Sequence, residues 1–227
     1  MTLLHIETST NVCSVALSLD GNCIFLKKNM EGMNHATMLS PFIEDALQYL
    51  KKQNGKLDAI AVSAGPGSYT GLRIGVSTAK GLCYGLSIPL IAVSTLEIMT
   101  LAALAVNNKK NALYCPMIDA RRMEVYAAIY NANGDIVRDI QADIIDMNSY
   151  SDILNESEVV FFGNGADKCK TTITHPNATF IDNIYPTAEF MIPKAEKAFN
   201  NSEFVDVAYF EPFYLKEFQT TTPKSIK

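Results

Sequence analysis

Residues 3–28 read LLHIETSTNVCSVALSLDGNCIFLKK, and this stretch sets the architecture of the first part of the chain. The apolar run Leu3–Glu7 is typical of a short buried strand. Val12–Leu19 alternates apolar with small polar residues, which predicts a strand with one covered face. Asp20-Gly21-Asn22 has hairpin-turn chemistry, so Cys23–Lys28 is predicted to return antiparallel to the second strand. Three meandering strands therefore open the chain.

Helices and strands alternate after this meander. The sequence predicts helices over 34–52, 70–86 and 95–106, and strands over 57–64 and 89–93. A strand meander followed by alternating helices and strands is the ribonuclease-H-like pattern of a mixed α/β sheet. We therefore expect an α/β fold.

A polar run at 107–111 is the expected boundary between an N-terminal lobe, 1–106, and a C-terminal lobe, 107–217. In the second lobe, strands are predicted over 112–118, 124–130, 136–140, 159–162 and 179–181, and a helix over 187–199. With so little helix, the second lobe is predicted to be a reduced copy of the first. The tail, 218–227, is expected to be disordered.

Composition limits the classes of function. Hydrophobic residues make up 48% of the 227 residues and charged residues 19%, so the chain has enough apolar material for a packed core. The net charge of −5 argues against nucleic-acid binding by this chain alone, which usually needs a basic face. Five cysteines without a CxxC pair indicate reduced thiols. The N-terminus lacks signal-peptide features, so we expect a cytoplasmic protein with no membrane contact.

The glycine-rich segment 65–75, GPGSYTGLRIG, follows a predicted strand and opens a predicted helix. Such a loop can direct backbone N–H groups at an anion, although it matches neither a Walker A loop nor GxGxxG. Its candidate anion- or nucleotide-binding residues are Gly65, Gly67, Ser68, Thr70, Gly71 and Arg73. The alternative is a tight turn whose small residues allow helix–sheet packing.

Charged residues are dense at 119–126, DARRMEVY, directly after a predicted strand. Asp119 is a candidate acid facing the space between the lobes, and Arg121 a candidate anion contact. The alternative is a solvated hairpin turn with paired charges. A metal site is not expected, because His35 is followed four residues later by Leu39, where a second ligand would share its helix face.

Two predicted helices carry more apolar surface than a monomer's surface helix needs. The first is apolar over about half its circumference, and the second has small residues at three- or four-residue steps. We expect these helices to form a partner interface, centred on Met38, Phe42, Leu72, Gly75, Val76, Ala79 and Cys83. The alternative is a large internal core contact with the second lobe.

Five motifs, in order, resemble one family. They are IETST–NVCSVAL, GPGSYTGLRIG followed by STAKGL, IPLIAVSTLE, IDARRMEVYAAIY and EPFYLKE. This set is similar to the TsaB (YeaZ) family of bacterial tRNA threonylcarbamoyladenosine biosynthesis proteins. The resemblance covers most of the chain, with little signal between 140 and 205.

The resemblance implies two ribonuclease-H-like lobes of the actin/Hsp70/sugar-kinase fold. It also implies a non-catalytic paralogue of the metal-binding subunit TsaD, whose HxxxH motif corresponds here to a segment without the second histidine. The phosphate loops of the fold correspond to segments that include Thr8 and Ser9 and, in the second lobe, Asp119 and Arg121, without the usual glycines. No tightly bound cofactor is therefore expected, and ATP or ADP would be held only at a complex interface.

The implied function is accessory. A threonylcarbamoyl group passes from an adenylate donor to an adenosine beside the tRNA anticodon, with TsaD binding metal and donor. This chain would dock on TsaD and activate it, have no activity alone, be joined by the ATPase TsaE, and meet tRNA through the complex. A homodimer is expected when TsaD is absent. The alternatives are an independent small-molecule kinase or peptidase of the same fold, or a self-associating scaffold.

Overall fold

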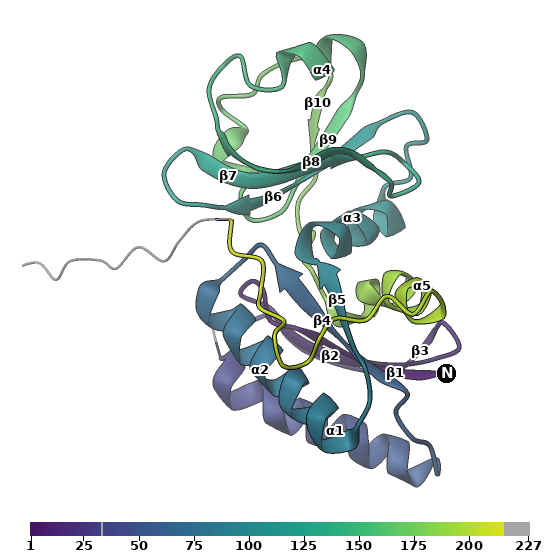
Figure 1. The fold of residues 1–227 in the computed structure, drawn as a ribbon. Coiled ribbons are helices and arrows are strands. Elements are labelled where there is room, and N and C mark those ends of the chain that lie inside the picture. The colour runs from purple at the N-terminus through teal and green to yellow at the C-terminus, as the bar shows by residue number, and fades with distance from the viewer. Residues whose placement is uncertain (33, 216–227) are drawn as a thin grey trace, which may run out of the picture.

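The computed structural model describes residues 1–32 and 34–215 and contains two stacked α/β lobes (Figure 1). This confirms the predicted fold class, two ribonuclease-H-like lobes with the second reduced. The tail predicted to be disordered lies outside the described residues.

The first lobe is built on a five-stranded sheet of order β3-β2-β1-β4-β5. Its strands are β1 (Thr2–Glu7), β2 (Cys13–Leu19), β3 (Asn22–Asn29), β4 (Ala59–Gly65) and β5 (Leu90–Ser94). The predicted hairpin is confirmed, because Leu19 pairs with Asn22 and both turn residues, Asp20 and Gly21, have positive φ. β4 pairs with β1 in parallel, so the meander is extended by crossover connections.

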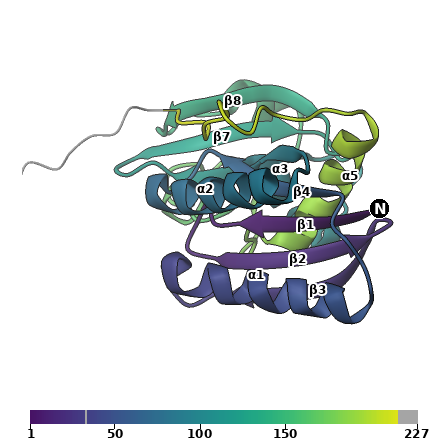
Figure 2. The same cartoon turned by 60° about the horizontal axis from the view of Figure 1, so that its bottom comes forward.

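Helices cover both faces of this sheet (Figures 1 and 2). One face meets α1 (His35–Lys52) and α2 (Tyr69–Leu86), and the other meets α3 (Thr95–Val106), the 3₁₀ turn η2 (Ala188–Met191) and α5 (Ile192–Asn200). Alternation along the strands explains this arrangement. Leu4 and Ile6 belong to the cluster under α1 and α2, whereas Leu3 packs with Met191 on the opposite face.

The second lobe repeats the topology of the first. Its strands are β6 (Leu113–Asp119), β7 (Glu124–Tyr130), β8 (Ile136–Ile144), β9 (Val159–Phe162) and β10 (Ala178–Phe180), in the order β10-β9-β6-β7-β8. As in the first lobe, the first three strands form an antiparallel meander, β6-β7-β8, and the first of them, β6, pairs in parallel with β9 on its other side. The helical layer is thin, with only α4 (Ser151–Glu156) and the turn η1 (Asp167–Cys169) between β8 and β10. β8 extends four residues beyond its predicted end, and α4 was not predicted.

The two lobes share helices across the predicted boundary at residue 107. The α3 residues Leu96 and Met99 pack with Tyr114 of the second sheet. In the reverse direction, α5 was expected in the C-terminal lobe but packs through Ala195 on the first sheet. The division at residue 107 stays a prediction, since contacts from both sides cross it.

The predicted interface on α1 and α2 needs correction. Six of its seven residues belong to the interior of the first lobe, namely Phe42, Leu72, Gly75, Val76, Ala79 and Cys83. The side chains of Leu72, Val76, Ala79 and Cys83 are at most 3% exposed, and Met38 alone is half-buried. The physical reason is that the lobe's own sheet covers the most apolar face of α2, so the face open to a partner is a different one.

Candidate functional site

A cleft of about 740 Å³ lies between the lobes. Its walls are the β1–β2 connection (9–11), the loop before α2 (66–70), the β6–β7 hairpin (118–122) and a C-terminal segment (213–215). These segments meet because β1, β4 and β6 all end at this side of their sheets. Ligands of open α/β sheets bind at such strand ends.

Six of the ten candidate binding residues line this cleft, namely Ser9, Gly67, Ser68, Thr70, Asp119 and Arg121. The structure thus brings together three segments that are distant in sequence. The other four, Thr8, Gly65, Gly71 and Arg73, do not line the cleft.

The glycines of the segment before α2 serve close packing. A Cβ at Gly71 would lie 2.1 Å from the Thr8 carbonyl oxygen, and one at Gly67 would lie 2.2 Å from that of Ser9. The Thr8 hydroxyl donates to the Gly71 carbonyl at 2.8 Å. These contacts support the packing interpretation, in which small residues let α2 begin directly against the β1–β2 connection.

Ser68 and Arg73 of this segment each have a local contact. Ser68 is the N-cap of α2, and its Oγ accepts from the Gly71 N–H at 3.2 Å. The Arg73 guanidinium stacks over the Tyr69 ring at 4.6 Å. These two contacts orient both side chains at the start of α2.

The β6–β7 hairpin is held by a lysine that the sequence analysis missed. Lys168 forms an ion pair with Asp119 and also donates to the carbonyl oxygens of Arg122 and Glu124, at 2.7 and 2.6 Å. Asp119 also accepts from the Arg121 N–H at 3.1 Å. The hairpin therefore carries paired charges, as the alternative interpretation held. Lys168 lies 49 residues from Asp119, and no local motif signals that pairing.

Glu7 lies immediately behind the cleft and is fully buried. Its Oε1 accepts from the Ser9 N–H at 2.5 Å, while Oε2 has no hydrogen-bond partner. Burial raises the pKa of Glu7 to about 7, and the hydrogen bond from Ser9 works in the opposite direction. Glu7 is thus a carboxyl group that holds its proton near neutral pH.

The His35 side chain is buried and hydrogen-bonded to the backbone. It is 4% exposed, and its Nε2 lies 2.7 Å from the Thr10 carbonyl oxygen. Because a carbonyl only accepts, Nε2 is the donor. Leu39, where a second ligand would stand, is in the core. Within residues 1–32 and 34–215, no three His, Cys, Asp or Glu side chains are grouped to hold a metal ion.

The cleft can therefore offer an anion the N-terminal end of α2 and the exposed Arg121. Two carboxylates line it, Asp119, which pairs with Lys168, and Glu124.

A second, apolar groove of about 410 Å³ lies between the outer faces of α1 and α2. Its lining residues are Ser40, Ile43, Glu44, Leu47, Gln48, Lys51, Thr78 and Leu82. Leu47 and Leu82 are only partly buried in this chain. An apolar floor with polar edges is the usual make-up of a protein-binding surface.

Comparison with known proteins identifies the family. The model of the family described as "TsaD: tRNA N6-adenosine threonylcarbamoyltransferase" matches residues 30–208. The TsaB protein of Escherichia coli is 32% identical over 222 residues, which cover 95% of each chain. The chain belongs to the TsaB family. The TsaB protein of Bacillus subtilis is 34% identical over 76% of this chain and 75% of its own.

Solved TsaB-like structures have the same fold. YeaZ from Pseudomonas aeruginosa superposes with a TM-score of 0.78 at 29% identity, covering 94% of this chain and 99% of its own. A second structure, described as similar to peptidase YEAZ from the same organism, has a TM-score of 0.82 at 28% identity, covering 95% and 99%. The resemblance read from the motifs is confirmed across both lobes, including the stretch where the sequence alone carries little signal. Among the described residues, no helix has the length and apolarity needed to cross a membrane.

Proposed function

We propose that this chain is the non-catalytic TsaB subunit required for threonylcarbamoylation of the adenosine beside the tRNA anticodon, and that it docks on TsaD and activates it. The observation that carries the proposal is the match, over nearly the full length of both chains, to proteins named for tRNA threonylcarbamoyladenosine biosynthesis.

The state of the cleft supports an accessory role. His35 is engaged by a backbone carbonyl, and Lys168 neutralises Asp119. Metal and donor binding are therefore assigned to TsaD. ATP or ADP would contact this chain only where a partner completes the cleft, and TsaE would join the assembled pair. The net charge of −5 suits a subunit that meets tRNA through its partners.

The groove between α1 and α2 is the proposed TsaD-docking surface. Leu47 and Leu82 would be buried there by apolar side chains of the partner, and Glu44 and Lys51 lie in the same lining at its polar edge. When TsaD is absent, a second copy of this chain would cover the same surface. Packing of two helices from each molecule buries all four apolar faces at once.

A charge placed in this groove tests the proposal. Leu82→Glu should leave the chain folded by circular dichroism, because the side chain is only partly buried, and should abolish co-elution with purified TsaD. The matched control is Met147→Glu, at a residue 82% exposed on the other lobe, which should co-elute normally. Co-elution of folded Leu82→Glu with TsaD at wild-type affinity would place the interface elsewhere.

A further inference from the structure

The segment 203–215, called the C-terminal strap here, crosses the first lobe beside α2 and ends at the cleft (Figure 1). It has no helix and only an isolated bridge to β5, yet it is fixed at both ends. The Val205 N–H donates to the Leu90 carbonyl at 3.0 Å, and the Phe213 N–H donates to the Ala64 carbonyl at 2.7 Å. Val207 and Phe210 pack against the core.

The middle of the strap is built around Tyr209. The Lys80 ammonium on α2 donates to the carbonyl oxygens of Ala208 and Phe210, at 3.0 and 2.9 Å, on either side of that residue. Asp206 Oδ1 accepts from the N–H groups of Ala208 and Tyr209, at 2.7 and 3.0 Å. The backbone is thus held from both sides, while the Tyr209 side chain is 85% exposed.

An exposed aromatic side chain on an ordered backbone is suited to be a binding anchor. Tyrosine is enriched among the residues that dominate protein–protein affinity. Because the backbone of Tyr209 is already ordered, binding would cost little conformational entropy there.

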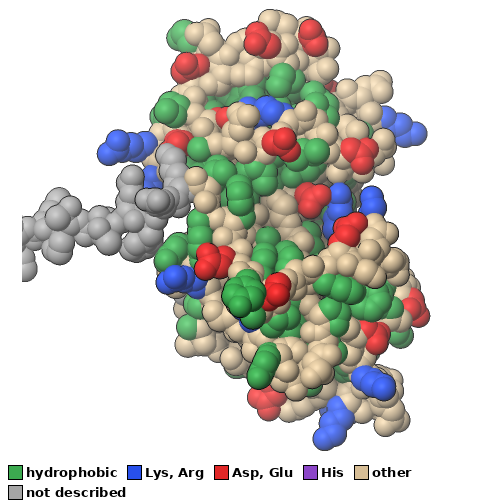
Figure 3. Space-filling model, in the orientation of Figure 1, with side chains coloured by type: hydrophobic (Ala, Val, Ile, Leu, Met, Phe, Trp, Pro, Cys, Tyr) green, Lys and Arg blue, Asp and Glu red, His purple; other side chains and the backbone are tan. Residues whose placement is uncertain are grey.

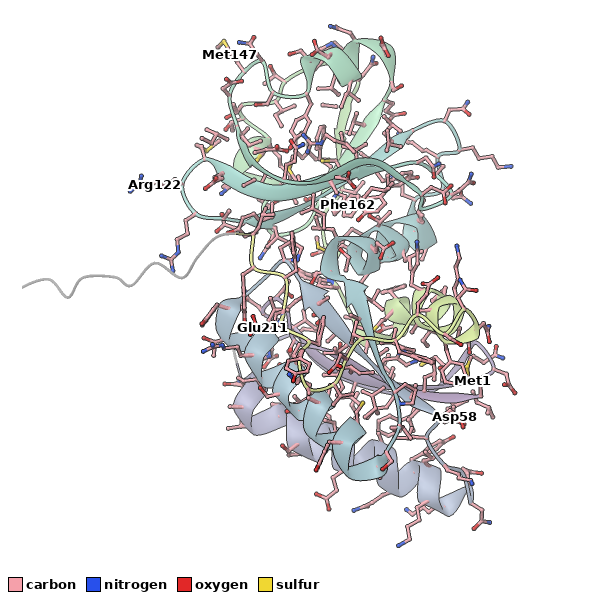
Figure 4. The ribbon with its side chains drawn as sticks, viewed as in Figure 1. Met1, Asp58, Arg122, Met147, Phe162 and Glu211 are labelled. Atoms are coloured by element: carbon pink, nitrogen blue, oxygen red, sulfur yellow. The ribbon has the colours of Figure 1, made fainter. Side chains whose placement is uncertain are left out.

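The charge around the ring indicates the chemistry of the partner. The strap contains Glu203, Asp206 and Glu211 and no lysine or arginine, and the one cation described above beside it, Lys80, is engaged by two backbone carbonyl oxygens. Figure 3 shows acidic side chains among the hydrophobic ones over α2 and the strap, and Figure 4 places Glu211 on the front of the strap. Acidic groups repel a phosphate backbone, so they favour a basic protein surface over RNA.

The position of the strap on α2 links it to the groove. At about 100° per residue, the side of α2 that runs from Lys80 through Gly81 to Leu82 spans roughly 200° of the helix. The arc between them on one side holds Ser77, Gly81 and Tyr84, all exposed, and a Cβ added at Gly81 would meet nothing within 4 Å. A partner seated on this arc would have the groove on one side and the strap on the other.

We propose that Tyr209 is an anchor residue for the protein that docks on the outer face of α2, and that its ring enters an apolar recess lined by lysine or arginine. This rests on the proposed function, which makes that protein TsaD. The strap and the groove are then two sides of one docking surface.

The test measures the affinity of purified TsaD for variants of the full chain by calorimetry. Tyr209→Ser should raise Kd by at least about tenfold, as expected for the loss of an aromatic anchor. Tyr209→Phe, which keeps the ring, should stay within about threefold of wild type. Glu211→Lys should weaken binding at low salt and approach wild type at high salt, because salt screens charges at the rim of an interface. Met147→Ser, equally exposed on the other lobe, is the control.

The two proposals fail in distinguishable ways. If Leu82→Glu abolishes binding while Tyr209→Ser matches the control, the strap inference is overturned and groove docking stands. If Tyr209→Ser weakens binding and Leu82→Glu does not, Tyr209 is a binding anchor and the proposal that TsaD docks in the groove is overturned. If neither changes Kd, both are overturned. If Tyr209→Ser leaves TsaD binding intact and instead weakens binding of labelled tRNA to the complex, the occupant is RNA and the inference is wrong.

Discussion

His5 and Glu7 stand two residues apart on β1, on the face that packs against η2 and α5, and both are fully buried. Burial lowers the pKa of His5 to about 3 and raises that of Glu7 to about 7, because each group loses the hydration of its charged form. The consequences for stability have opposite signs. Protonation of His5 in the unfolded chain removes stability as pH falls below about 6.5, whereas ionisation of Glu7 in the unfolded chain removes stability as pH rises from about 4.5 to 7.

Glu7→Gln should remove only the second effect. The amide keeps an oxygen to accept from the Ser9 N–H and carries no charge to desolvate. At pH 8 the variant should be more stable than wild type by up to about 3 kcal/mol, from about 2.5 pKa units at 1.36 kcal/mol each. Near pH 4 the two should be about equal. Urea unfolding at pH 4, 5.5 and 8 measures this, and a stability difference independent of pH would contradict it.

Gly71 and Gly81, both on α2, allow a matched test of whether the glycines near the start of this helix are needed for close packing. A Cβ at Gly71 meets the backbone oxygen of Thr8, which cannot move aside, so Gly71→Ala should destabilise the protein by about 2 kcal/mol or more. Gly81 is open, so Gly81→Ala should stabilise it by roughly 0.5–1 kcal/mol through helix propensity. Thermal unfolding of both variants tests this, and equal effects would show that the tight contact at Gly71 is unimportant.

The α2 helix shows which of its faces is internal. Val76 is 3% exposed, and the next residue, Ser77, is exposed. Val76→Glu should therefore cost about 3 kcal/mol or more by burying an unpaired charge, and should unfold the first lobe rather than merely detach a partner. Ser77→Glu should leave the melting temperature nearly unchanged. A folded Val76→Glu variant with wild-type stability would show that this face of α2 is not internal and is available to a partner.

Sequence periodicity predicted the bounds of helices and strands better than it predicted which parts of the molecule those elements pack against. The bounds of α2 were predicted within one residue and those of α3 and β9 without error, because capping residues and apolar runs are local signals. The covered face of α2 was assigned wrongly, since an apolar stripe does not say whether the chain's own sheet or a partner covers it. Likewise, Asp119 was predicted at the cleft, but its pairing with Lys168 depends on a long-range contact.

The arrangement of the two lobes leaves a cleft between them and an apolar groove on the outer side of the first lobe. α3 packs on the second sheet as well as the first, α5 returns to the first sheet, and the strap ends at the cleft between the lobes. The proposed accessory role rests on these two surfaces.

Reconstitution of tRNA modification from purified TsaD, TsaE, donor-forming enzyme and tRNA is the most direct test of this role. Threonylcarbamoyladenosine should form only when this chain is present, and Leu82→Glu should behave like its omission while Met147→Glu behaves like wild type. This chain without TsaD should form none. Modification at an equal rate without this chain, or modification by this chain alone, would contradict the proposed function.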